Sequence, residues 1–225
     1  MNYLPRTIQP VIEEASKFFK IVMVSGMRQV GKSTLLKQLS SDKRTIISFD
    51  DINNLESAKN APLQFLQLNP PPCFFNQVQR VPEIFKALKI SVDSRSEKGL
   101  YWLSGSQKLS LMSQVSDALP GRLMNFELWP FSIYEIAGKG LEQKPYLPSF
   151  SLSSNLPILD PADTWNAVFQ GFWPELKKAT ETERSWFFRS LVDLYLSRDV
   201  RSLSGIEKFD EFEKFCLLYT SPSPR

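Results

Sequence analysis

The sequence contains no histidine, and this absence excludes several kinds of active site. A chain without an imidazole cannot form a Ser-His or Cys-His nucleophile pair, a histidine-ligated zinc site or a histidine general base. Cysteine is also scarce, because the chain has only Cys73 and Cys216. Both lie in apolar stretches without metal-ligand spacing, so we expect buried, reduced thiols, which favour a cytoplasmic protein.

Long apolar runs and a strong charge of one sign are missing as well. No stretch approaches the ~20 apolar residues of a membrane span, and Pro5, Pro10, Glu13 and Glu14 interrupt the region where a signal peptide needs an apolar run. We therefore expect no membrane partner. The net charge of +3 and the dispersed basic residues give little support to a nucleic-acid partner, which stays an unsupported alternative.

The apolar residues that are present alternate between two periods. The 225 residues are 42% apolar and 23% charged, which is typical of a globular protein. Helical spacing separates the short apolar runs, and this alternation predicts an α/β fold with a parallel five-stranded sheet covered by helices. The predicted strands are 21–24, 45–49, 73–75, 100–103 and 123–128.

Composition also suggests where domains end. We expect a core over residues 1–138 and a linker or long loop over 139–160, which is rich in proline and serine. Aromatic stripes at helical spacing predict a helical region over 161–217, with those stripes as a core face. The Ser-Pro ending over 218–225 follows a helical pattern without a capping signal, so we expect a truncated or non-native tail there.

The segment GMRQVGKST, residues 26–34, fits the phosphate-binding pattern GxxxxGK[ST] between a predicted strand and a predicted helix. In such a loop, backbone N–H groups surround phosphate oxygens and the following helix directs its positive dipole end toward them. Lys32 would reach the β and γ phosphates, and the Ser33 hydroxyl would ligate Mg²⁺. Arg28 would add charge toward phosphate or lie as a solvated surface residue. The predicted nucleotide-binding residues are Gly26, Arg28, Gln29, Val30, Gly31, Lys32, Ser33 and Thr34.

Several segments together carry a resemblance to a known family. They are YLPRTI, GMRQVGKST, SFDD, PPCFFNQVQRVPEIF, YWLSGSQ, the pair Gly121-Arg122, WPFS, FWPEL and YLSRDV. These segments resemble prokaryotic AAA-like ATPases that carry a C-terminal domain of unknown function. The resemblance implies a P-loop NTPase three-layer sandwich with an extra strand between the phosphate-loop strand and the Walker B strand. It also implies ATP and Mg²⁺ as cofactors, and a longer chain whose C-terminal domain is mostly missing here.

One departure from this family concerns the Walker B pair. Family members end the third strand with Asp-Glu, whereas this chain has Asn76 and Gln77. In P-loop enzymes the aspartate orients Mg²⁺, and the glutamate activates the attacking water. An amide cannot accept that proton, so the resemblance predicts slow or absent hydrolysis and weakly held Mg²⁺. Asp50, Asp51 and Glu127 are the candidates for a substitute acid, and turn and helix capping is our preferred interpretation of the two aspartates.

Two further residues are catalytic candidates by resemblance. Ser106, with Ser104 and Gln107, is similar to the polar sensor of the γ phosphate, and the alternative is a Ser-Gly turn with a helix cap. Arg122 resembles an arginine that reaches phosphate in cis or from a neighbouring subunit, and the alternative is a structural salt bridge.

The favoured function is ATP binding with impaired hydrolysis. The first alternative is an active Mg-dependent ATPase that uses another acid, or in which Asn76 and Gln77 are errors in the sequence. A small-molecule kinase is disfavoured because no Arg-rich lid is visible. Both AAA-like rings and monomeric switches carry these motifs, so a homo-oligomer stays open as a partner.

Overall fold

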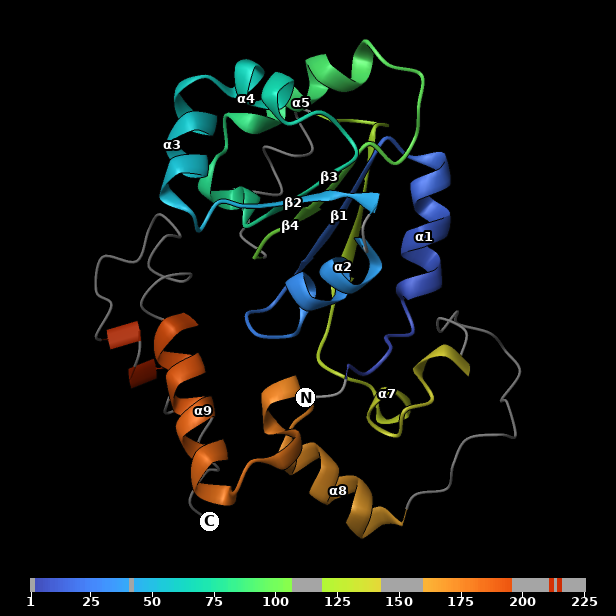
Figure 1. The fold of residues 1–225 in the computed structure, drawn as a ribbon. Helices are drawn as coiled ribbons and strands as arrows, with labels where there is room; N and C mark the ends of the chain where they lie inside the picture. The colour runs from blue at the N-terminus through green and yellow to red at the C-terminus, as the bar shows by residue number, and fades with distance from the viewer. Residues whose placement is uncertain are drawn as a thin grey trace. The chain divides into compact units, whose positions relative to one another are not determined.

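Strands and helices alternate along the chain in the computed structural model, which describes residues 3–40, 43–106, 119–142, 160–195, 211–212 and 214–215 (Figure 1). The strands are β1 (Ile21–Gly26), β2 (Thr45–Ser48), β3 (Cys73–Asn76), β4 (Tyr101–Ser104) and β5 (Leu123–Leu128). The α-helices are α1 (Gln9–Phe18), α2 (Lys32–Ser40), α3 (Ile52–Asn60), α4 (Pro62–Leu68), α5 (Ile84–Asp93), α7 (Ile133–Ile136), α8 (Pro161–Gln170) and α9 (Glu181–Leu194). The 3₁₀ turns are η2 (Val78–Arg80), η3 (Gly140–Glu142) and η4 (Pro174–Lys178).

The five strands form one parallel sheet in the order β2-β3-β4-β1-β5, which confirms the predicted fold class. Strand β4 lies between β1 and β3, so the extra strand implied by the family resemblance is present. The register places Ser48 of β2 beside Asn76 of β3, and Asn76 beside Ser104 of β4. Three polar side chains therefore stand in a row at the carboxyl edge of the sheet, where ligands of open α/β sheets bind.

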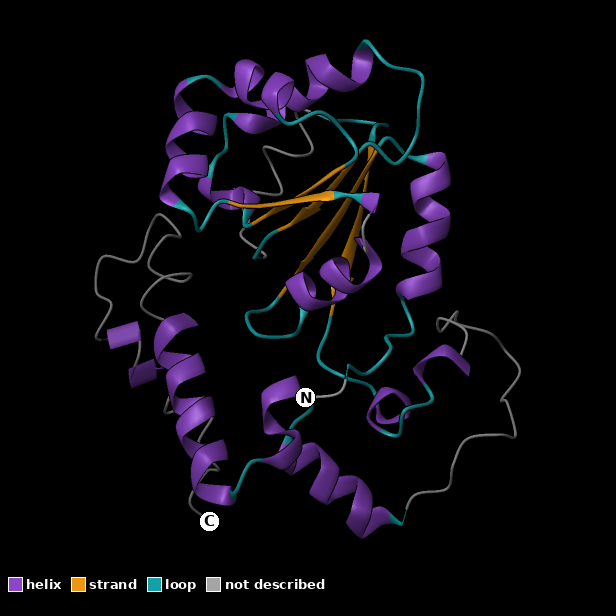
Figure 2. Ribbon diagram, in the orientation of Figure 1, coloured by secondary structure: helices purple, strands orange, loops and turns teal. Residues whose placement is uncertain are grey.

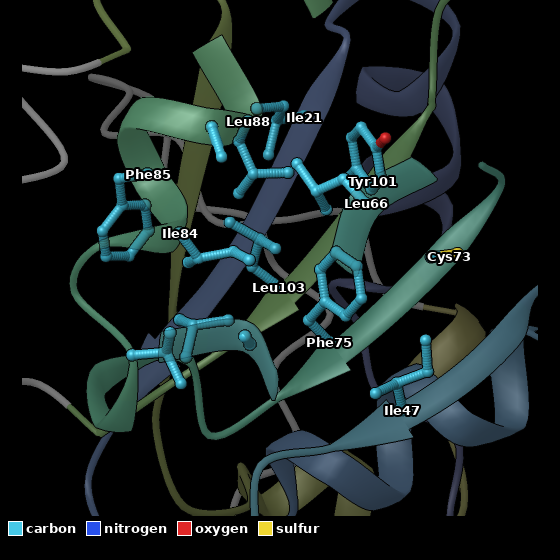
Figure 3. Close-up of a cluster of buried hydrophobic side chains, with 14 of the residues drawn as sticks. Ile21, Ile47, Leu66, Cys73, Phe75, Ile84, Phe85, Leu88, Tyr101 and Leu103 are labelled. Carbon is cyan, nitrogen blue, oxygen red and sulfur yellow. The ribbon is translucent and has the colours of Figure 1, made fainter. Parts of the chain in front are cut away.

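Helices cover both faces of the sheet (Figures 1 and 2). Because neighbouring strand residues point to opposite faces, each central strand contributes to two apolar clusters. The cluster under α3, α4 and α5 contains Met23, Phe75, Tyr101 and Leu103, several of which are drawn in Figure 3. The cluster under α1 and α2 contains Val22, Phe74 and Trp102 among others. This arrangement is the predicted three-layer sandwich.

Cys73 begins β3, is fully buried and forms no disulfide, as its apolar context predicts. Burial raises the pKa of its thiol to about 11, which keeps the thiol protonated and unreactive near neutral pH. Cys216 lies outside the described residues.

The chain divides into two compact units, residues 1–177 and 178–225. The first unit extends past the predicted core end at residue 138, because the segment after α8 packs with the core. Helix α8 begins at Pro161, where the helical region was expected, and most of the predicted linker is outside the described residues. The tail over 218–225 also lies outside them.

Helix α9, in the second unit, begins with a capping box in which Thr180 accepts from the Glu183 backbone and Glu183 accepts from the Thr180 backbone.

The aromatic stripes of α8 and α9 do not form the expected core face among the described residues. Trp165 is 72% exposed and Trp186 is 67% exposed. In the part of the chain that the structure describes, no helix has both the length and the apolar character that crossing a membrane requires.

Candidate nucleotide site

The segment between β1 and α2, which we call the phosphate loop after its motif, has the strand-loop-helix arrangement that the motif predicts. Gly26 ends β1 with φ 142°, and a Cβ there would overlap the carbonyl oxygen of Leu128 on the neighbouring strand. Gln29 and Gly31 have φ of 61° and 95°, both in the left-handed region. A backbone that alternates between right-handed and left-handed conformations curls, so that successive N–H groups can face one ligand. The loop therefore has the conformation of an anion-binding nest.

The side chains of the loop differ in burial and in their contacts. Val30 is fully buried and belongs to the cluster under α1 and α2, so its side chain anchors the loop. Lys32 begins α2, and its ammonium donates to the Gly26 carbonyl at 2.9 Å and to the Met27 carbonyl. Burial, and secondly the charge of Arg28, lower the Lys32 pKa to about 8. Arg28 thus brings its positive charge close to Lys32, whereas Thr34 is exposed in the first turn of α2.

Asn76 ends β3 and joins three hydroxyl groups from three different elements. Its Oδ1 accepts from Ser33 Oγ at 2.5 Å and from Ser104 Oγ at 2.6 Å. Its Nδ2 donates to Ser48 Oγ at 3.2 Å. Asn76 is only 7% exposed, so its amide is largely shielded from water. The structure therefore brings Asn76 next to the Mg²⁺-ligand candidate Ser33, with an uncharged amide where a P-loop enzyme has a carboxylate.

Gln77 follows Asn76 in the left-handed region, with φ 63°. Its Oε1 accepts from Gln79 Nε2 at 2.6 Å, so the side chain bonds within its own turn. The aspartates after β2 have several partners, and Asp50 Oδ2 accepts from Ser48 Oγ at 3.4 Å. Asp51 caps α3 by accepting from the backbones of Asn53 and Asn54, as our preferred interpretation predicts, and Asp50 pairs with Arg80 at 2.8 Å.

The two other catalytic candidates have different surroundings. Ser106 follows β4 at the carboxyl edge of the sheet, is 7% exposed, and its Oγ has no hydrogen-bond partner among the described residues. Gln107 lies outside the described residues. Arg122 precedes β5 at the opposite, amino edge of the sheet, where it forms a two-pronged ion pair with Asp93 at 2.5 and 3.0 Å. The structure thus shows the salt-bridge alternative for Arg122 and does not bring it to the phosphate loop.

Sequence reasoning missed a buried ion pair behind the loop. Arg6 Nε lies 3.1 Å from Glu135 Oε1, and both side chains are less than a tenth exposed. The Glu135 carboxylate also accepts from the Thr7 and Ser132 backbones, each at 2.8 Å. The Arg6 guanidinium stacks on Phe131, and burial lowers the Arg6 pKa. This pair connects the N-terminal segment to α7.

Arg6 also bonds directly to the phosphate loop. Its Nη1 donates to the Val30 carbonyl at 3.0 Å, and its Nη2 donates to the Trp129 carbonyl at 2.5 Å. A second external contact comes from Trp173, whose Nε1 donates to the Arg28 carbonyl at 3.2 Å. Both residues stand in segments that carry the family resemblance, YLPRTI and FWPEL, but no local pattern showed that they meet the loop.

The parallel sheet with β4 inserted between β1 and β3, together with the loop between β1 and α2, defines a P-loop NTPase fold. Comparison with protein families agrees: a family model described as an AAA domain matches residues 18–137. The chain belongs to this nucleotide-binding AAA family. A second model, described as a domain of unknown function (DUF8612), matches residues 162–223.

Two curated relatives resemble the chain over 141 residues. They are uncharacterized proteins of Mycobacterium bovis and Mycobacterium tuberculosis, and each is 27% identical to it. The matched region is 60% of this chain and 32% of each relative. The chain thus spans about a third of the length of these curated relatives.

Proposed function

We propose that the chain binds ATP through the loop between β1 and α2 and hydrolyses it slowly or not at all, so that ATP acts as a structural or switching ligand. The observation that carries this proposal is the amide of Asn76 beside Ser33, in place of a carboxylate. The choice of ATP over GTP rests on the family and on the lack of an [NT]KxD base-reading motif in the sequence.

Phosphate binding is supported by the groups that line the loop. Lys32 provides a cation at the start of α2, Arg28 adds charge nearby, and the left-handed residues Gln29 and Gly31 shape the backbone as a nest. The first turn of α2 adds the positive end of its dipole. These groups fit a polyphosphate and involve neither Asn76 nor Gln77.

A magnesium ion fits the same site less well. Mg²⁺ in nucleotide sites is held by carboxylates together with substrate phosphates. Here the candidate ligands are the Ser33 hydroxyl and the Asn76 amide oxygen, which already bond to each other. Among the described residues, no group of three or more Asp, Glu, Cys or His side chains could hold a metal. We therefore expect ATP binding that depends only weakly on Mg²⁺.

Slow hydrolysis is supported because positions 76 and 77 provide no carboxylate, and the Asp50 carboxylate meets this network at Ser48 Oγ, from which it accepts at 3.4 Å. Asn76 and Gln77 are amides, Asp50 is paired with Arg80, and Asp51 caps α3. A positioned general base contributes about 10²- to 10⁴-fold to a rate, so its loss slows water attack without preventing binding.

Titration with a fluorescent ATP analogue, with and without Mg²⁺, tests the binding part of this proposal. We expect saturable binding, weakened about 10- to 150-fold by Lys32→Ala, because hydrogen bonds from a charged donor are the strong ones. Lys37→Ala is the matched control, since Lys37 is an exposed lysine in the last turn of the same helix. Equal binding by Lys32→Ala and the unmodified chain, or no binding by the folded unmodified chain, contradicts the proposal.

A further inference from the structure

Two carbonyl groups of the phosphate loop are held by donors outside it. The Arg28 carbonyl accepts from the Trp173 indole at 3.2 Å, and the Val30 carbonyl accepts from the Arg6 guanidinium at 3.0 Å. Trp173 lies 145 residues beyond Arg28 in sequence, and Arg6 lies 24 residues before Val30. Segments from both sides of the core sequence therefore meet on alternate peptide groups of the same loop.

Peptide geometry gives these two contacts a consequence for phosphate binding. A trans peptide is planar, so its N–H points opposite to its C=O. The peptides that join Arg28 to Gln29 and Val30 to Gly31 are both trans. A donor that holds the Arg28 carbonyl fixes the direction of the Gln29 N–H, and one that holds the Val30 carbonyl fixes that of the Gly31 N–H. Each N–H then points away from its external donor.

We propose that Arg6 and Trp173 are positioning residues for the phosphates of the nucleotide. By holding the Val30 and Arg28 carbonyls outward, they keep the Gln29 and Gly31 N–H groups turned toward the ligand before it binds. This inference rests on the proposed ATP binding and adds two residues that the phosphate-loop motif does not contain. Trp173 lies in the part of the DUF8612 match that belongs to the first compact unit, so this contact to the phosphate loop is made within that unit.

Trp173 is the better residue for a test, because Arg6 has other structural contacts. Arg6 pairs with Glu135 and bonds to the Trp129 and Pro130 carbonyls, so its loss would disturb more than the loop. Trp173 packs against the cluster under α1 and α2. Phenylalanine keeps an aromatic ring in that place and removes the N–H donor. Trp165→Phe is the matched control, because the Trp165 side chain is 72% exposed.

The test measures affinity for ATP and for inorganic tripolyphosphate, by competition with the fluorescent analogue, well below each variant's melting temperature. We expect Trp173→Phe to weaken both ligands by a similar factor of about 2 to 13, the range for one hydrogen bond, and Trp165→Phe to weaken neither. A purely structural role would lower the melting temperature and leave the tripolyphosphate affinity of the folded protein unchanged. If the unmodified chain binds both ligands and Trp173→Phe binds them equally well, this inference is overturned and the proposed function stands. If the unmodified chain binds neither ligand, both are overturned.

A measurement on the unmodified chain remains decisive if Trp173→Phe does not fold. The chain has five tryptophans, so ¹⁵N-labelled indole resonances can be assigned by elimination with Trp→Phe changes at the other four. We expect the Trp173 indole resonance to move when tripolyphosphate is added, because a hydrogen bond at the Gln29 N–H polarises the peptide that Trp173 contacts. Loop resonances that move while the Trp173 resonance stays unchanged contradict the inference.

Discussion

Changing Asn76→Asp together with Gln77→Glu should raise ATP turnover by about 10²- to 10⁴-fold, the usual contribution of a positioned general base. An aspartate at 76 can accept the same hydrogen bonds from Ser33 and Ser104 that Asn76 accepts, so the network tolerates the change. Ser48 would then have to donate to this side chain rather than accept from it. Steady-state ADP release, at saturating ATP and Mg²⁺, measures the effect.

The single change Gln77→Glu and a change at Glu127 serve as controls for this result. Gln77→Glu alone should recover part of the rate, because it supplies the proton acceptor without the Mg²⁺-orienting carboxylate. If the unmodified chain already turns over as fast as the double variant, another acid performs the chemistry. Glu127, which lies beside Ser25 in the register of β5 and β1, is then the first residue to change to glutamine.

Glu135→Ala should lower the free energy of unfolding by about 3–5 kcal/mol, the usual result of removing one partner of a buried ion pair. The change leaves the Arg6 guanidinium buried without its carboxylate and removes the acceptor of the Thr7 and Ser132 backbone N–H groups. Urea denaturation measures the loss.

An exposed ion pair in the same protein provides the comparison. Glu14 and Lys17 pair at 2.7 Å with side chains 74% and 73% exposed. Glu14→Ala should leave the urea midpoint unchanged, because solvent-exposed pairs contribute little. Equal effects of the two changes would mean that the Arg6–Glu135 pair is no more important than a surface pair.

The sheet and the phosphate loop were predictable because their signals are local. Each central strand alternates between two apolar faces, as Val22 and Met23 do, and so appears in the sequence as a continuous apolar run. The residues of the loop motif are likewise contiguous in sequence, so the motif alone predicts that they form one loop between a strand and a helix. The place of Asn76 at the carboxyl edge of the sheet was predictable because it directly follows such a run, whereas its interpretation as a replacement for an acid comes from the family resemblance and stays a prediction.

The rest of the site depends on contacts between distant residues. Arg6 and Trp129 are 123 residues apart in sequence, and no periodicity links them. Arg122 is the converse case: the family resemblance suggested phosphate contact with a salt bridge as the alternative, and its place before β5 puts it at the amino edge of the sheet, where it pairs with Asp93. Trp165 and Trp186 were expected on a buried face and are exposed. Helical spacing identifies the apolar face of a helix, but it does not show which other segment packs against that face.

Single-turnover analysis distinguishes a chain that holds ATP intact from one that hydrolyses it. The chain is mixed in excess over ATP with Mg²⁺, samples are quenched in acid over time, and the remaining ATP and the ADP formed are quantified. We expect ATP to stay bound and intact over the interval in which the chain with Asn76→Asp and Gln77→Glu converts it to ADP. Conversion of bound ATP by the unmodified chain at the rate of that double variant would mean that Asn76 and Gln77 do not impair hydrolysis.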